Sequence, residues 1–524
     1  MMPNRSTDPL FQLIHSLGKA EKRNFKLYVK RNSSREDLKM VQLFDVLDRM
    51  AEYDDAAVLH KIPDLRKDQL ANRKAHLYKQ ILGSLRLLQS GDNVDINLHE
   101  QLDFARILYN KGLYHQSLKV LDRAREFAKE HNQVSFLVPI IFLEKKIESL
   151  HITRSLQDRA RTLATESTEV AKNLVQLTQL SNLALELYSW YINHGHARNA
   201  ADEKLVEEFF RDNLPPHVDE LQGFYQKLYY YQSYCWYAFI RQDFLQYYRY
   251  TQKWVDLFQQ SPDMIGVEIT HYIKGLHNLL NAHFDLRNFK KFDATLQQFE
   301  ELAESPVVTG HHNATLQCFI YLYTARINKH FLEGTFKEGL KLVPYINEKL
   351  QEYRFYLDRH RVLVFYYKIA SLYFGSGDYE TTIDYLNKII NWKVDLRTDL
   401  QCYARLLHLI AHYELGNYQL IEYLVKSVYR FMAKMDNLGA VEEEIFRFLR
   451  TSFDLSPREL KPAFEELLAR LKQFENDPHG TRAFSYLDFI SWLESKIRGV
   501  NVQDVIREKF QRIKRPDGLP SHHR

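Results

Sequence analysis

The sequence predicts an all-helical protein, and three observations support this fold class. Only 18 glycines and 14 prolines occur among 524 residues, so few positions interrupt a helix. Apolar residues recur at i, i+3, i+4 and i+7 over long stretches, with almost no strand-like alternation. A phrase made of a turn, an aromatic residue and an amphipathic run, as in Ser371–Ile390, also returns along the chain. Repetition of this kind in a helical chain predicts stacked helix–turn–helix units.

The first predicted element is a small basic helical domain, residues 1–90. Residues 1–96 contain 17 Lys and Arg against 13 Asp and Glu, which is the entire basic excess of a chain with 71 basic and 67 acidic residues. The remainder is neutral, which disfavours a nucleic-acid-wrapping array because phosphate binding needs a concentrated basic field. The domain itself keeps that option open.

Two groups of residues in this domain are candidates for nucleic-acid binding. The spacing of Lys19, Lys22, Arg23, Lys26 and Lys30 predicts a basic helical stripe, with Ala20, Leu27 and Tyr28 turned inward. A short helix, a turn containing Pro63 and a second helix then follow, in the outline of a helix-turn-helix. That second helix would present Asn72, Arg73, His76 and Lys79 to base edges. A solvated helical bundle that starts the stack explains the same pattern.

The second element is a repeat array, residues 97–435. Its turns are predicted near Gly112, Gly195, Gln242, Arg287, Gly334, Gly377 and Gly416, with one more near Arg154. The last five spacings are 47, 45, 47, 43 and 39 residues, so about eight helix pairs are expected. A small residue at the turn lets the first helix end in the left-handed conformation. The aromatic residue two positions later can fill the crevice between the paired helices.

Two stretches of the array, 104–124 and 368–390, share one spacing. It reads Ala-x-x-x-x-x-x-Gly-x-Tyr-x-x-small and begins at Ala105 and Ala370. In this spacing the chain resembles the tetratricopeptide repeat (TPR) superfamily, in the long-helix variant of Rap-type peptide-sensing regulators. The resemblance implies a right-handed α-solenoid of helix pairs whose concave face binds a protein or peptide. It also implies the order of a small effector domain followed by a sensor array.

The third element is a C-terminal helical cap, residues 436–515, followed by a flexible tail, 516–524. Ser456 and Glu459 have the spacing of a capping box, and Pro457 stands at the first helical position. A further helix is predicted over 482–497. These helices would cover the open end of the stack.

The sequence contains no motif of catalysis, nucleotide binding or metal binding, so a non-enzyme without cofactor or metal is expected. Its three cysteines, Cys235, Cys318 and Cys402, form no disulfide framework and suit the reducing cytoplasm. The longest apolar run, Phe136–Leu143, is far shorter than the ~20 residues that a membrane-spanning helix needs.

The most unusual segment is Phe224–Phe258, which concentrates a dozen or more aromatic rings in one repeat. Most of these rings are expected in the core between long helices. Tyrosines left at a groove would give rigid contact area with a polar tip. The candidate binding residues are Tyr230, Tyr234, Tyr237, Arg241, Arg249 and Lys253, which suit a ligand of acidic and aromatic character.

The sequence therefore predicts a non-catalytic scaffold or adaptor that binds a protein or peptide along the concave face of its repeats. The alternative is an intracellular regulator whose N-terminal domain binds nucleic acid or an effector protein under the control of a peptide-sensing array. Neither the partner nor the oligomeric state follows from the residues.

Overall fold

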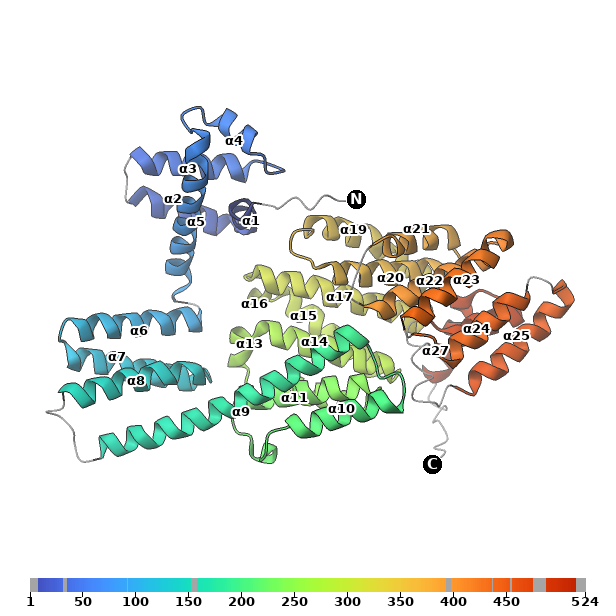
Figure 1. Ribbon diagram of the computed structural model, residues 1–524. Helices are drawn as coiled ribbons and strands as arrows, with labels where there is room; N and C mark the ends of the chain where they lie inside the picture. The colour runs from blue at the N-terminus through green and yellow to red at the C-terminus, as the bar shows by residue number, and fades with distance from the viewer. Residues whose placement is uncertain are drawn as a thin grey trace. The chain divides into compact units, whose positions relative to one another are not determined.

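A computed structural model describes residues 8–31, 35–91, 93–151, 158–392, 397–435, 437–452, 455–474 and 487–514 (Figure 1). These residues form helices joined by turns, and no strand occurs among them. The all-helical prediction is confirmed. The chain divides into two compact units, Met1–Leu174 and Val175–Arg524.

Unit 1 begins with a five-helix bundle around its own core. The helices are α1 (Pro9–Ser16), α2 (Lys19–Arg31), α3 (Arg35–Asp48), α4 (Asp55–Lys61) and α5 (Lys67–Gln89). The core contains Phe25, Phe44, Leu47, Leu77 and Ile81, all fully buried. The long helix α5 packs against α1, α2 and α3, so it is the central support of the bundle.

The rest of unit 1 contains α6 (Val94–Asn110), α7 (Tyr114–Glu130), α8 (Val134–His151) and the first half of α9 (Arg159–His194). A buried ionic network ties three of these helices together. The carboxylate of Glu144 on α8 accepts hydrogen bonds from Arg125 on α7 and Arg159 on α9. Glu144 is only 1% exposed, so its charge depends on both arginines for compensation.

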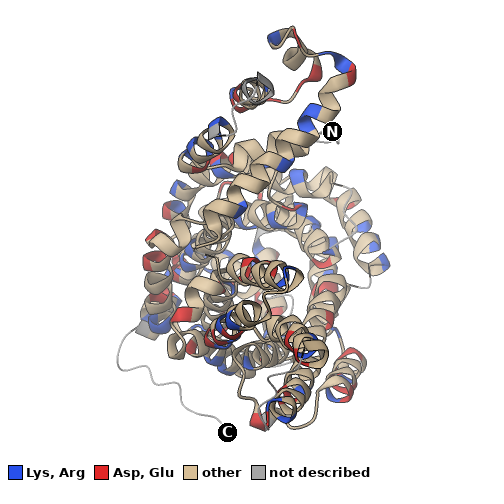
Figure 2. Cartoon of the chain, turned by 90° about the vertical axis from the view of Figure 1, so that its left-hand side faces the viewer, with Lys and Arg blue, Asp and Glu red and all other residues tan. Residues whose placement is uncertain are grey.

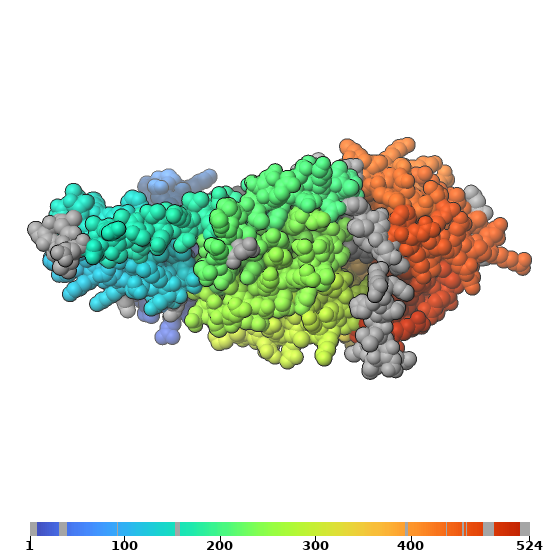
Figure 3. Space-filling model, turned by 90° about the horizontal axis from the view of Figure 1, so that it is seen from below, coloured from blue at the N-terminus to red at the C-terminus, as the bar shows by residue number. Residues whose placement is uncertain are grey.

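Unit 2 continues in helix pairs. The members are α10 (Ala200–Asn213), α11 (Phe224–Ile240), α12 (Phe244–Gln260), α14 (Ile269–Asp285), α15 (Phe289–Glu304), α17 (His312–Glu333), α18 (Phe336–Gly339), α19 (Val343–Glu352), α20 (Arg359–Ser376), α21 (Tyr379–Ile390), α22 (Thr398–Glu414) and α23 (Tyr418–Lys434). Short helices α13 (Asp263–Val267) and α16 (Pro306–Thr309) join successive pairs. Each pair packs on the next, and the colours of Figure 3 follow the chain order across this unit.

The first helices of these pairs form one layer of unit 2. Helix α14 packs on α17, α17 on α20, and α20 on α22, while α12, α15, α21 and α23 are the second helices of their pairs. We call α11, α14, α17, α20 and α22 the first-helix layer. Figure 2 shows acidic and basic residues interspersed over the helices rather than gathered in one field, as the nearly balanced charge predicts.

The predicted turns have the predicted backbone. Positive φ angles occur at Gly112, Gly195, Gln242, Arg287, Gly334, Gly377 and Gly416. The non-glycine residues Gln242 (φ 59°) and Arg287 (φ 51°) therefore accept the left-handed conformation at these turns. The turn predicted near Arg154 lies outside the described residues.

One feature of the middle of the chain was not predicted. Residues Arg159–His194 form a single 36-residue helix, α9, where regular pairs would require a helix end. The division between the two units falls within this helix, after Leu174. Residues 159–194 contain neither glycine nor proline, so no residue in this stretch signals a turn; Gly195 comes directly after it.

The C-terminal helices are α24 (Ala440–Thr451), α25 (Pro457–Lys472), α26 (Phe489–Arg498) and α27 (Val502–Lys514). The capping box is confirmed, because the backbone N–H of Ser456 donates to Glu459 Oε2 at 2.8 Å. Helix α27 packs along the turns of the preceding pairs. The Arg507 guanidinium donates to the carbonyl oxygen of Gly334, and the ring centres of Phe510 and Phe289 are 4.7 Å apart. The part of the predicted 482–497 helix before residue 487 and the tail, 516–524, lie outside the described residues.

Candidate functional site

The aromatic residues that the sequence singled out pack mainly on one another. The Tyr234 ring stacks on Tyr250 of α12 at 4.1 Å and meets Tyr230 edge-on at 4.9 Å. The Tyr237 ring stacks on Phe210 of α10 at 4.2 Å. Burial raises the pKa of Tyr250 to about 12 and also raises the pKa of Tyr230. These rings form a cluster between α10, α11 and α12 in which Tyr237 and Phe210 are buried and the other three are half-buried.

The three cations predicted beside these rings differ in their surroundings. Arg241 is bound within the protein: its guanidinium lies 2.7 Å from Glu203 Oε1 and donates to the Tyr237 hydroxyl at 2.7 Å. Lys253 is exposed, with its ammonium 4.8 Å from the centre of the Tyr250 ring, and Arg249 is exposed. Only Arg249 and Lys253 are therefore accessible enough to meet a ligand directly.

A second group of residues, missed by the sequence analysis, meets in the first-helix layer. We call it the first-helix cluster, and its members are Trp236 on α11, Lys274 and His277 on α14, Tyr321 on α17, and Arg361 and Lys368 on α20. The Lys274 ammonium lies 5.0 Å from the Tyr321 ring centre and 5.6 Å from that of Trp236. The Arg361 guanidinium carbon lies 5.4 Å from the Tyr321 ring, on which His277 stacks at 4.1 Å.

The cluster extends across the unit. The guanidinium of Arg397, next to α22, lies 5.6 Å from the ring of Tyr191 on α9, although about two hundred residues separate them in sequence. Arg397 is held by Asp399 through bonds of 2.8 Å. The Tyr191 ring also stacks on Trp236 at 5.6 Å, so α9 and the residues before α22 both adjoin the first-helix cluster.

The electrostatics of the cluster are dominated by its cations. Burial alone would raise the pKa of Tyr321, but the charges of Lys274 and Arg361 lower it below its ordinary value. Burial and the same two cations, with Lys368, lower the pKa of His277, which is therefore neutral near pH 7. Arg361 is paired with Asp358 at 3.1 Å. Among the described residues, no carboxylate lies within 4.0 Å of the Lys274 ammonium.

One acid–base pair of this region is poorly compensated. Burial raises the pKa of Asp285, at the end of α14, to about 7, although Lys368 and Arg287 act to lower it. Burial likewise lowers the pKa of Lys368 to about 8, against the attraction of Asp285. The Lys368 ammonium donates to Asn328 Oδ1 at 2.6 Å instead of meeting the carboxylate directly. Charged groups held in this way are typical of functional sites.

A pattern in the sequence could have indicated this region. Lys274, His277, Asn281 and Asp285 follow one another at i, i+3, i+7 and i+11 of helix α14 and so share one face of it. All four are half-buried, whereas the opposite face of α14 is fully buried. A polar stripe on the first helix of a pair is therefore a better guide than the concentration of tyrosines.

The basic stripe of α2 is only partly available. Lys22 is paired with Asp48 and Lys26 with Asp45 of α3, each at 2.6 Å. Lys19, Arg23 and Lys30 are exposed, and together with Lys22, Lys26 and Leu27 they line a shallow open depression. The inward placement of Ala20 and Leu27 was wrong, since both are exposed, Leu27 by 52%; Phe25 and Val29 supply the buried face instead.

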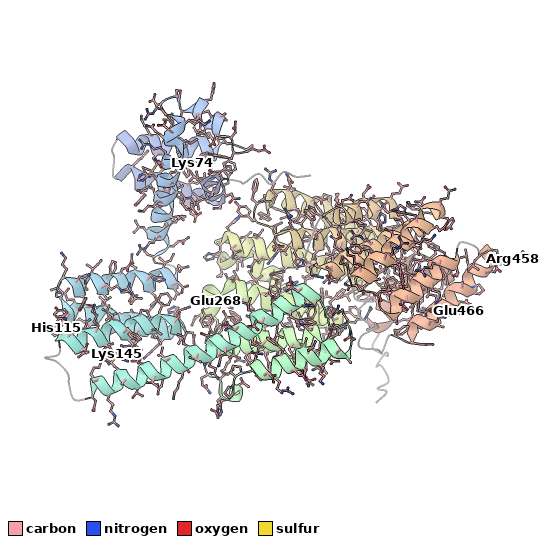
Figure 4. The ribbon with its side chains drawn as sticks, in the orientation of Figure 1. Lys74, His115, Lys145, Glu268, Arg458 and Glu466 are labelled. Atoms are coloured by element: carbon pink, nitrogen blue, oxygen red, sulfur yellow. The ribbon has the colours of Figure 1, made fainter. Side chains whose placement is uncertain are left out.

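The four residues predicted to face nucleic acid on the second helix of the helix-turn-helix lie on α5, and they are not equally exposed. Asn72, His76 and Lys79 are exposed, and Arg73 is half-buried. Lys74, which the sequence analysis did not select, is a half-buried residue of α5 (Figure 4), and its ammonium is 2.7 Å from Asp8 Oδ2. It also donates to the hydroxyl of Tyr53, whose pKa burial raises to about 12. Lys74 therefore joins α5 to Asp8 and Tyr53 of the same bundle.

Comparisons with known proteins add no identification: no protein-family model and no curated protein sequence matches this chain. Within the described residues, no three His, Cys, Asp or Glu side chains are placed to hold a metal ion. No described helix is long and apolar enough to cross a membrane. The three cysteines are buried and unpaired with one another.

Proposed function

We propose that this protein is a non-catalytic binding protein of the TPR type, in which the first-helix layer of unit 2 forms a concave face that holds a segment of another protein or a peptide. The observation that carries this proposal is the first-helix cluster, in which cations and aromatic rings from three consecutive first helices converge on Tyr321. Convergent polar groups among aromatic walls are typical of ligand sites.

The chemistry of the cluster favours an acidic segment. Lys274 offers an ammonium that no described carboxylate neutralises, and Arg361 lies on the same phenol ring. An aromatic or aliphatic side chain of the ligand could rest against Trp236, and its carboxylates could accept from Lys274. A charge-assisted hydrogen bond of this kind contributes about 1.5–3 kcal/mol.

Site-specific photo-cross-linking tests the proposal. A benzophenone amino acid replaces either Tyr188 or Tyr423. Tyr188 is a 40% exposed residue of α9 whose ring centre lies 4.9 Å from that of Trp236, and Tyr423 is a 70% exposed residue of the second helix α23. In the native cells, discrete protein or peptide adducts are expected at position 188 and not at 423. Lys274→Met should then weaken capture about tenfold. Equal labelling at both positions, or none at 188, contradicts a first-helix-layer site.

The alternative function rests on the exposed cations Lys19, Arg23 and Lys30 of α2. In it, the bundle of unit 1 binds nucleic acid or an effector protein, under control of the array. Nucleic-acid binding should weaken steeply as salt rises, because each neutralised phosphate releases counterions. Replacing Lys19, Arg23 and Lys30 together by Ala should abolish it, and binding that survives this change would place the surface elsewhere, with Arg73 and Lys79 of α5 as the next candidates.

A further inference from the structure

Helix α14 carries charges of opposite sign at the two ends of its polar stripe, and the function proposed above uses only the basic end. Lys274 and Asp285 lie on one face of this helix, with His277 and Asn281 between them. All four side chains are half-buried, so they border the first-helix layer and still reach water.

The Asp285 carboxylate is the acidic end of the stripe. Lys368 of α20 attracts it but donates to Asn328 Oδ1 at 2.6 Å, and no cationic side chain of the described residues lies within 4.0 Å of the carboxylate. Lys368 and Arg287 do not offset the cost of burial, which raises the pKa of Asp285 to about 7. Asp285 therefore lacks the close cation that a buried carboxylate needs.

The Lys274 ammonium is the basic end of the stripe. It lies 5.0 Å from the ring centre of Tyr321, and within the described part of the chain no carboxylate approaches it to 4.0 Å. The charges of Lys274 and Arg361 lower the pKa of Tyr321, although burial alone would raise it. The basic end therefore favours a carboxylate, and the acidic end favours an ammonium or a guanidinium.

The length of the stripe sets the spacing of these two groups in a ligand. From Lys274 to Asp285 the helix rises about 16 Å, at about 1.5 Å per residue. An extended peptide advances about 3.3 Å per residue, so about five residues cover the same distance.

We propose that the segment held by the first-helix layer carries charges of both signs: a carboxylate that pairs with Lys274 and, about five residues along, a lysine or arginine that pairs with Asp285. This inference rests on the proposed function and adds the basic residue and its spacing to it. A segment with acidic residues throughout would place negative charge beside Asp285, and like charges in contact disfavour binding.

Peptide binding to the full-length chain, followed by fluorescence anisotropy, tests the proposal. The probe is an acetylated, amidated peptide with an uncharged fluorophore, in which four uncharged residues, one of them Leu, separate a Glu from a Lys. It is made in both orders, Glu first and Lys first, because the ligand can run along α14 in either direction. Three comparators accompany each order: Lys replaced by Gln, Glu replaced by Gln, and the same composition with Glu and Lys adjacent.

In one of the two orders, the spaced peptide should bind about tenfold more tightly than each of its comparators, because each end forms a charge-assisted contact. Asp285→Asn should remove the preference for Lys over Gln. This substitution removes a half-buried carboxylate without changing the size of the side chain, so the fold is retained. Asp384→Asn, at an exposed carboxylate of the second helix α21, is the matched control and should keep the preference.

Two results overturn this inference and leave the proposed function standing: equal binding of the Lys and Gln peptides while Glu→Gln in the peptide weakens binding, or a Lys preference that persists in Asp285→Asn. Absence of binding by every peptide in both orders, up to the solubility limit, overturns the inference as well. Photo-cross-linking at Tyr188 then decides the proposed function separately.

Discussion

Replacing Gly334 by alanine tests whether helix α27 is docked on the turn after α17. Gly334 has φ +65°, and a Cβ atom there would lie 2.5 Å from the backbone nitrogen of Arg507 and 2.6 Å from the carbonyl oxygen of Gln503. Both atoms belong to the backbone of α27, so the clash is relieved only if that helix moves. Gly377 is the matched control, because it has φ +90° and open space around its Cβ position.

The structure sets the size of both effects. Gly377→Ala costs about 1–2 kcal/mol, the price of an L side chain in the left-handed conformation. Gly334→Ala has this cost and also disrupts the docking of α27, which buries Val505 (1% exposed) and Ile506 (7% exposed). At about 1.5–3 kcal/mol for each side chain, docking is worth about 3–6 kcal/mol. The clash of the new methyl group with α27 cannot cost more than the docking free energy of α27, because the helix can undock and so relieve the clash.

Hydrogen exchange of the amides in Val502–Lys514 is the appropriate assay, because it reports local opening in a chain of two units that need not unfold together. Gly334→Ala should speed exchange in α27 by about 100-fold or more, and Gly377→Ala should leave α27 protected. If Gly334→Ala changed α27 no more than Gly377→Ala does, the packing of α27 on this turn would be refuted.

Three further predictions follow from particular contacts. Tyr234→Ala removes the stack of this half-buried ring on Tyr250 and should cost about 1.5–3 kcal/mol near α11. Tyr423→Ala, at a 70% exposed position, should leave the unfolding midpoint almost unchanged. Equal midpoints for the two variants would show that the tyrosine cluster does not contribute to the core. Glu144→Gln removes the most buried of the three carboxylates around Arg125 and leaves Asp122 at 3.3 Å and Glu166 at 3.6 Å. It should therefore destabilise unit 1 by about 1–3 kcal/mol, which faster proteolysis between α7 and α9 would report. The pKa of Asp285 is about 7 in the folded protein and 3.8 ordinarily. The unfolded chain therefore loses the Asp285 proton at lower pH than the folded chain does. As a result, the contribution of Asp285 to the stability of the folded state falls as pH rises from about 4 to about 7. Asp285→Asn should therefore raise the melting temperature, relative to the parent, more at pH 8 than at pH 4.5, and a pH-independent difference would argue against a buried carboxyl.

The residues of the turns and caps were predictable because their signals are local. Gly377 ends one helix in the left-handed conformation, and Asp378 begins the next by accepting from the N–H of Thr381 at 3.0 Å. The spacing of such turns located Gln242 and Arg287 as well, although neither residue favours a positive φ by itself. The candidate site was less predictable, since Lys274, Tyr321 and Arg361 come from three different helix pairs.

The sequence by itself determined that this chain is helical, where most of its turns lie and how several helices begin, because helix periodicity and turn chemistry act over a few neighbouring residues. Only the tertiary structure decided which charges and rings meet. Lys22 and Lys26 form ion pairs with Asp48 and Asp45 of another helix, and the Tyr234 ring stacks on Tyr250. Helix α11 has aromatic side chains on every face, so its sequence does not indicate which face is buried. The buried face is determined by the helices that pack against α11.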